Sequence, residues 1–228
     1  MSRSRDLRGM RLEQDLGFQI KYRESTSDMN GDREMLPVVT MPSRMTTDEL
    51  LALPDDDGFD RWLIRGELRE KPMTRRNRFH SRLTSRLCHI LEDWIDNQPE
   101  PRGGVFAGEA GCRLARDPDT TVGIDVVYLN WDQMVKLTND TTIIDGAPTL
   151  AIEILSPTNT VDEIEDKLKL YLESGISLIW VVNPYSRTVT AHQPDCPPEL
   201  FNLRHELTAP KQLPGFRVLV ADLFRVVI

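Results

Sequence analysis

Two acidic residues stand inside apolar stretches of the sequence. Asp125 begins the run DVVYL, and Glu153 lies in the middle of LAIEILS. An ionised carboxylate buried in a strand is costly unless it is paired, hydrogen-bonded or bound to a metal. If the two strands are neighbours, both carboxylates can converge on one Mg²⁺, a cation that prefers oxygen ligands. The alternative is a salt bridge from each acid to a nearby arginine or lysine.

A lysine that follows Glu153 in the sequence is the third candidate. At about 100° per residue, four residues form the apolar face of the helix predicted there: Ile164, Leu168, Tyr171 and Leu172. Lys167 lies at the border of this face and is expected to point at the sheet. Two alternatives stay open, because a border lysine often extends its amine to solvent and Glu163 is a competing partner four residues earlier.

Two further acids stand beside glycines, Glu67 in GEL and Glu109 in FAGEAG. From the pattern alone, a solvated turn residue is the better interpretation of each.

Basic residues are concentrated in one part of this acidic chain, between residues 71 and 86. The spacing of four arginines places them on one helix face: Arg75, Arg78, Arg82 and Arg86. Lys71 and Arg76 are close to them in the sequence. Such a face can bind the phosphates of a nucleic acid, although many basic helix faces are simply solvated. His80 lies near the amino end of the same helix and is a further candidate for contact with nucleic acid. The alternative is that His80 has a structural role.

Hydrophobic periodicity predicts the elements that position these residues. Residues 75–97 are expected to form a helix with an apolar stripe at steps of three and four: Phe79, Leu83, Leu87, Ile90 and Trp94. A second long helix is expected from residue 161 to a C-cap at Gly175. Strand-like runs include a hairpin or bent strand in FDRWLIRGELREKPM and buried strands in TLAIEIL and ISLIWVVNP. This order predicts an α/β fold in which helices pack against a mixed sheet.

The chain divides into two parts on its sequence pattern. Residues 1–45 lack a sustained period and are expected to be a largely irregular extension, in which LGFQIKY is a candidate strand. A folded domain is expected over residues 46–228, starting with a short helix in MTTDELLAL.

Composition argues against several classes of protein. The net charge of −8 argues against a general nucleic-acid coat protein. The three cysteines, Cys88, Cys112 and Cys196, have no metal-ligand spacing, and they fit a cytoplasmic protein better than a disulfide framework. No apolar run approaches the roughly 20 residues that cross a bilayer, so a membrane protein is not expected.

The sequence resembles the Uma family of restriction endonucleases over roughly Met45 to Leu223. The most specific stretch is AIEILSPTNTVDEIEDKLKLYLESGISLIWVVNP, and FAGEAGCRLARDPDTTVGIDVVYL is similar to the preceding block of the family. The resemblance implies the PD-(D/E)XK nuclease superfamily, with a core sheet of about four strands, flanking helices, added hairpins and Mg²⁺-dependent phosphodiester cleavage. Mn²⁺ is an expected substitute, and the expected partner is nucleic acid, DNA before RNA. Restriction-type nucleases often dimerise to cut both strands, so a homodimer is compatible with the resemblance.

The resemblance also implies roles for individual residues. Asp125 matches the motif aspartate, Glu153 the second acid and Lys167 a helix lysine that replaces the usual strand lysine. Glu67 matches an early glutamate, and His80 matches the histidine of the first long helix.

Three positions depart from the family pattern. Ile124 stands where proline is usual, Leu155 where the strand lysine is usual and Asn183 where aspartate is common. Because Leu155 cannot act as the lysine, activity depends on Lys167. The alternative function is therefore a catalytically inactive nuclease fold that binds nucleic acid or a partner protein.

Overall fold

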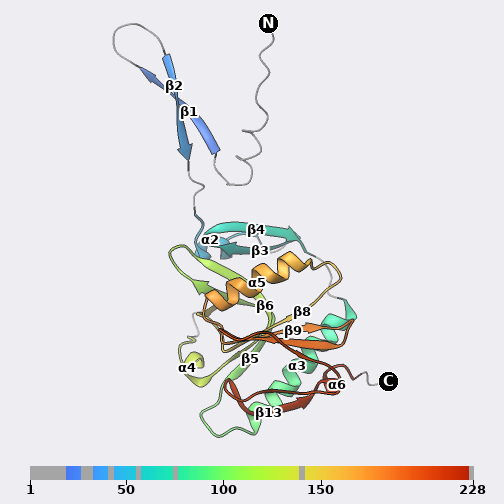
Figure 1. Cartoon of the computed structure of the whole chain (residues 1–228). Helices are drawn as coiled ribbons and strands as arrows, with labels where there is room; N and C mark the ends of the chain where they lie inside the picture. The colour runs from blue at the N-terminus through green and yellow to red at the C-terminus, as the bar shows by residue number, and fades with distance from the viewer. Residues whose placement is uncertain are drawn as a thin grey trace. The chain divides into compact units, whose positions relative to one another are not determined.

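The computed structural model describes residues 19–26, 33–40, 44–54, 58–73, 77–138 and 142–225, and it separates into two units, Met1–Met45 and Thr46–Ile228. In the first unit, β1 (Gln19–Thr26) and β2 (Arg33–Thr40) pair as antiparallel strands (Figure 1). The LGFQIKY segment thus overlaps a strand. The expectation of irregular structure is wrong for the rest of β1 and for β2, because their backbones hydrogen-bond to each other.

The second unit is built on a nine-stranded mixed sheet whose main path is β11-β10-β9-β8-β6-β3-β4, with β5 and β7 attached beside β6. The strands are β3 (Phe59–Ile64), β4 (Glu67–Pro72), β5 (Gly104–Ala115), β6 (Thr120–Leu129), β7 (Ile144–Asp145), β8 (Leu150–Ile154), β9 (Leu178–Asn183), β10 (Thr188–His192) and β11 (Glu199–Phe201). β8 and β9 are parallel, and the other pairs on the main path are antiparallel. The predicted mixed α/β sheet is confirmed, and FDRWLIRGELREKPM forms the β3–β4 hairpin.

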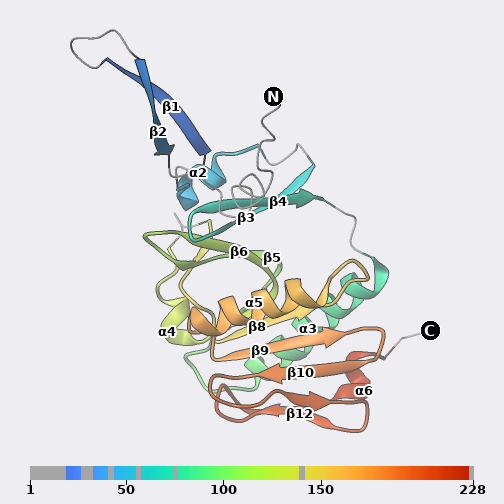
Figure 2. The same cartoon turned by 45° about the horizontal axis from the view of Figure 1, so that its top comes forward.

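Two long helices cover opposite faces of this sheet. The helices are α2 (Thr47–Leu51), α3 (Arg78–Asp96), α4 (Trp131–Met134), α5 (Val161–Glu173) and α6 (Val220–Leu223). Residues of α3 pack with Ile152 and Ile154 of β8, whereas Tyr171 of α5 packs in a separate cluster with Ala151. Since successive strand residues point to opposite faces, α3 and α5 lie on different sides of β8 (Figure 2). Within the described residues, no helix is long and apolar enough to cross a membrane.

The helix α3 begins two residues before its first buried side chain. Asn77 caps it by accepting hydrogen bonds from the amides of Phe79 and His80. The buried face consists of His80, Leu83, Leu87, Leu91, Trp94 and Ile95. The predicted apolar stripe is therefore wrong at its first position, because Phe79 is 46% exposed and the stripe starts at His80 instead.

The helix α5 connects the parallel strands β8 and β9. It starts at a capping box in which the Thr160 hydroxyl accepts from the Glu163 amide and the Glu163 carboxylate accepts from the Thr160 amide. Its last turn is followed by Gly175 at a φ of 90°, a conformation that glycine adopts without steric cost. This βαβ crossover sets the position of Lys167 relative to Glu153.

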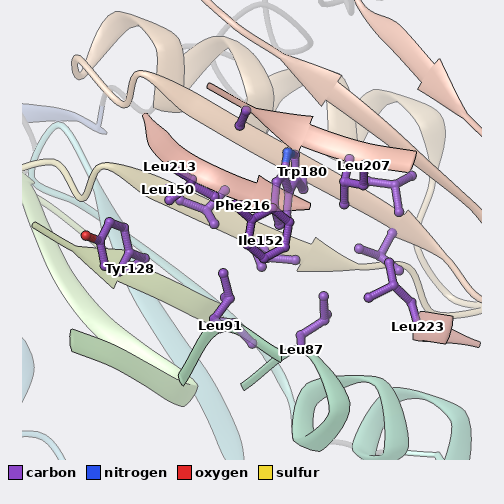
Figure 3. Packing of buried hydrophobic residues seen from close by; sticks show 14 of the residues in the cluster. Leu87, Leu91, Tyr128, Leu150, Ile152, Trp180, Leu207, Leu213, Phe216 and Leu223 are labelled. Atoms are coloured by element: carbon purple, nitrogen blue, oxygen red, sulfur yellow. The ribbon is translucent and has the colours of Figure 1, made fainter. Parts of the chain in front are cut away.

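The larger core lies on the α3 side of the sheet. Leu87 and Leu91 of α3 face Ile152 and Trp180, and a C-terminal hairpin adds Phe216 (Figure 3). This hairpin consists of β12 (Glu206–Ala209) and β13 (Leu213–Leu219), which α6 follows.

The sheet forks at β6. On one edge, β6 pairs with β8 through Val126–Tyr128 and with β3 at Thr121. Residues 122–125 of β6 lie between these two pairings, where β3 and β8 diverge from each other. Asp125 is the last of them before the β8 pairing begins.

Candidate active site

Asp125 and Glu153 both lie at this fork, immediately past the end of the β6–β8 pairing. The antiparallel register of β6 and β8 ends at the pair Val126–Ile152, and Asp125 and Glu153 each lie one residue beyond that last pair. Both side chains are buried, Asp125 at 5% exposure and Glu153 at 8%. The structure therefore brings together the two acids that the sequence singled out.

Asp125 is held by one hydrogen bond on each carboxylate oxygen. Its Oδ1 is 2.9 Å from His80 Nε2, and its Oδ2 accepts from the Ile154 amide at 2.8 Å. Burial by itself would raise the pKa of Asp125. The hydrogen bonds from His80 and Ile154, with the electrostatic effects of His80 and Lys167, outweigh that effect and leave the pKa of Asp125 lowered.

Glu153 is also bonded through both oxygens. Lys167 Nζ lies 2.8 Å from Oε2, and the Tyr171 hydroxyl donates to Oε1 at 2.6 Å. Lys167 therefore reaches across from α5 to Glu153, as its border position indicated. The Glu163 carboxylate, the competing partner in the sequence, accepts from the Thr160 amide in the capping box.

Sequence reasoning treated Tyr171 as a core residue and missed its contact with Glu153. The ring is fully buried, at 0% exposure, and the hydroxyl points at the carboxylate. Burial, followed by the nearby negative charge of Glu153, raises the pKa of Tyr171 well above its usual value, so the hydroxyl remains a donor. The available signal was its spacing, since Tyr171 lies one helical turn after Lys167 on the same face.

Replacing Tyr171 with phenylalanine is expected to lower the free energy of unfolding by about 1–3 kcal/mol, because a buried carboxylate oxygen loses its donor. Denaturant unfolding followed by circular dichroism measures the change. Tyr185→Phe is the matched control, since Tyr185 is 53% exposed and should change stability little. Equal stability of wild type and Tyr171→Phe would mean that the hydroxyl contributes no net stabilisation to Glu153.

His80 belongs to the acid pair rather than to the basic surface. Its side chain is buried, at 7% exposure, and its ring bonds to Asp125. The prediction that it forms part of a surface contact with nucleic acid does not fit this position. The first turn of α3 directs His80 inward, because the buried face of the helix starts there.

The predicted arginine surface is only partly present. Arg78 and Arg82 are exposed on α3, and Arg75 lies outside the described residues. Arg86 is half-buried, and its Nε donates to the Asp222 carbonyl oxygen at 3.2 Å. Arg86 therefore links α3 to α6 instead of extending an open cationic face.

Glu67 does not join the acid pair by any contact that the structure records. It begins the edge strand β4, its side chain is 56% exposed, and it forms an ion pair with Arg69 at 2.8 Å. The role that the resemblance implied for Glu67 has no support in this geometry. The β3–β4 turn explains its position, since β3 meets β6 at Thr121 rather than beside Asp125.

Glu109 lies closer in register to the acids. Ala107 pairs with Val126 and Ala110 with Ile124, so a bulge containing Glu109 stands opposite Asp125. Glu109 has a φ of 61°, and its Oε2 would lie 2.7 Å from a Cβ added at Gly123, so the Glu109 side chain extends over Gly123. Glu109, Gly123 and Lys167 line a cleft of about 430 Å³ beside β3 and β4. Bulges often redirect side chains next to active sites.

The carboxylate oxygens of Asp125 and Glu153 suit a hard divalent cation that needs few protein ligands. In the part of the chain that the structure describes, no group of three or more His, Cys, Asp or Glu side chains could hold a metal ion. Mg²⁺ commonly binds through one or two carboxylates and completes its octahedron with water and substrate phosphate. Each oxygen of Asp125 and Glu153 has two lone pairs, so one hydrogen bond leaves capacity for a metal. The two carboxylates therefore fit Mg²⁺.

A mixed sheet that carries buried acids on two neighbouring strands, followed by a helix with an inward lysine, is consistent with the PD-(D/E)XK nuclease class. The Uma2 family model, described as "Putative restriction endonuclease", matches residues 47–221. The chain belongs to this family, and this membership supports a nuclease role.

The fold is similar to that of a solved nuclease-family structure. It is described as a "putative nuclease belonging to DUF820" from Anabaena variabilis, with 23% sequence identity and a TM-score of 0.64. The match covers 79% of this chain and 97% of that chain. Comparison with curated proteins gives no match.

Proposed function

We propose that the protein is an Mg²⁺-dependent endonuclease that hydrolyses phosphodiester bonds of nucleic acid, with DNA as the favoured substrate. The observation that carries this proposal is the burial of Asp125 and Glu153 at adjoining ends of β6 and β8, with Lys167 Nζ 2.8 Å from Glu153. Two buried carboxylates and one ammonium group at one point are a combination that phosphodiester hydrolysis can use.

Each residue has a distinct part in this proposal. Asp125 and Glu153 would hold Mg²⁺, which when bound polarises the scissile phosphate and lowers the pKa of a coordinated water. Lys167 stabilises the negative charge that develops on the phosphate oxygens. His80 and Tyr171 fix the orientation of the two carboxylates through the bonds described above. Arg78 and Arg82, exposed on α3, attract the nucleic-acid backbone.

The test is a calorimetric titration of Mg²⁺ and Mn²⁺ into wild type and Glu153→Ala, without and with a DNA duplex. We expect binding by the wild type, strengthened by the duplex because phosphate oxygens complete the coordination, and loss of binding in the variant. A cleavage screen over DNA and RNA then identifies the substrate. Absence of metal binding to wild type in both titrations would contradict the proposal.

One observation favours a second function, a nuclease fold that binds nucleic acid without cutting it. All four oxygens of Asp125 and Glu153 already have hydrogen-bond partners within the protein, and Leu155 occupies the usual position of the strand lysine. A binding module of this kind would retain nucleic-acid affinity without a divalent cation and would show no turnover in the same screen.

A further inference from the structure

Two exposed aromatic side chains meet at the beginning of α3. Phe79 is 46% exposed and Tyr185, in the turn between β9 and β10, is 53% exposed. Their ring centroids are 6.5 Å apart with an interplanar angle of 69°. The two segments, distant in sequence, come together on the right of Figure 2. Their contact creates an apolar surface that the core does not cover.

Both aromatic residues are held in place by asparagine side chains. Asn77 Oδ1 accepts from the Phe79 amide at 3.0 Å, and Asn183 Oδ1 accepts from the Tyr185 amide at 2.9 Å. The backbone at each ring is thus fixed before any partner arrives. A fixed surface loses less conformational entropy on binding than a flexible one.

Both segments that carry the aromatic pair also carry exposed arginines. The Arg78 guanidinium lies over the Phe79 ring, 4.8 Å from its centroid. Arg82 is exposed one helical turn later, and Arg187 is exposed in the same turn as Tyr185. In a chain with a net charge of −8, this local group of cations complements a phosphate backbone.

The combination of exposed rings and cations indicates the kind of nucleic acid that fits. Aromatic side chains bind single strands by stacking on the faces of successive bases, while cations track the phosphates. In an intact duplex these base faces are already stacked and cannot reach a protein ring. The surface therefore suits an unpaired base better than a paired one.

The aromatic pair is linked to the candidate active site through the first turn of α3. Phe79 directly precedes His80, whose ring nitrogen is 2.9 Å from Asp125. A nucleotide bound on the rings would therefore lie at the same end of α3 as His80, the residue that contacts Asp125. The position connects base binding to the chemistry proposed above.

We propose that Phe79 and Tyr185 form a stacking surface for an unpaired DNA base, so that the nuclease prefers substrates with single-stranded nucleotides beside the scissile phosphate. This inference rests on the proposed nuclease function for its substrate preference. The stacking itself does not require a divalent cation.

The test measures binding of the full chain to a fluorescent single-stranded oligodeoxythymidylate and to a duplex of equal length, by anisotropy, at fixed salt and with EDTA. We expect wild type to bind the single strand more tightly. Phe79→Ala and Tyr185→Ala should each weaken single-strand binding about tenfold, since one stacked base is lost. Tyr185→Phe should retain most of the affinity because it keeps the ring.

The matched control is Leu200→Ala, which removes a side chain that is 59% exposed on β11 and should leave binding unchanged. Circular dichroism and thermal melting verify that the variants fold, as expected for substitutions at exposed positions. The proposal is overturned if both alanine variants bind the single strand like wild type, or if they lose duplex and single-strand binding equally.

Cleavage assays separate this inference from the proposed function. Ring-dependent binding without turnover in Mg²⁺ or Mn²⁺ would support the stacking surface and contradict the nuclease proposal. Turnover with unchanged binding by both alanine variants would support the nuclease and overturn the stacking surface.

Discussion

Replacing Glu153 with glutamine is expected to lower the rate of phosphodiester cleavage by about 100-fold or more, because the site loses a carboxylate charge that would hold the metal and so loses several kcal/mol of charge stabilisation in the transition state. Glutamine keeps the shape of the side chain and can still accept from the Tyr171 hydroxyl. Single-turnover cleavage with excess enzyme measures the effect on the chemical step.

The matched control for this substitution is Glu165→Gln. Glu165 is an exposed glutamate on α5, so its substitution also removes one negative charge but should leave the rate unchanged. Circular dichroism and thermal melting establish that both variants fold. Wild-type cleavage rates in both Asp125→Ala and Glu153→Ala would refute the assignment of these acids as the catalytic pair.

Replacing Lys167 with methionine is the second change with a large expected effect. Methionine retains an unbranched apolar side chain but removes the ammonium group that stabilises negative charge, so turnover should fall by about 100-fold. Metal binding measured by calorimetry should remain, because Glu153 keeps its carboxylate and loses a competing cation. Loss of turnover with retained metal binding would separate a catalytic role from a structural one.

Lys169→Met provides the control for this second prediction. Lys169 lies on the same helix, but its side chain is 75% exposed and its amine is 4.0 Å from Glu173, away from Glu153. Its substitution should leave the rate close to that of wild type. If Lys167→Met cleaves as fast as Lys169→Met, the ammonium group at Glu153 is not part of the catalytic machinery.

Hydrophobic pattern determined most of the secondary structure of this protein. The helical period fixed α3 and α5, and continuous apolar runs fixed β8 and β9, because burial on both faces leaves no polar alternation. The same logic singled out Asp125 and Glu153, since a charge in a buried strand needs a partner. It failed at Phe79, which has the spacing of a core residue but lies one position outside the buried face of α3.

Position on a helix was also informative for Lys167, since the angle per residue is fixed by backbone geometry. Its partner was not determined by the helix, because Glu163 and Glu153 were both within plausible reach. The βαβ crossover decided the contact with Glu153 by laying α5 across β8.

Tertiary structure alone decided which side chains surround the acids. His80 and Asp125 are 45 residues apart in the sequence, and their contact depends on how the start of α3 meets the fork in β6. Glu67 carries the same chemical group as Glu153, yet the pairing of β3 with β6 at Thr121 leaves it on an exposed edge strand. The sequence by itself determined the elements and the acids within them, because periodicity and the cost of burying charge are local properties. Strand order and register determined which side chains surround the acids. Both depend on pairings between distant segments, which no local pattern specifies.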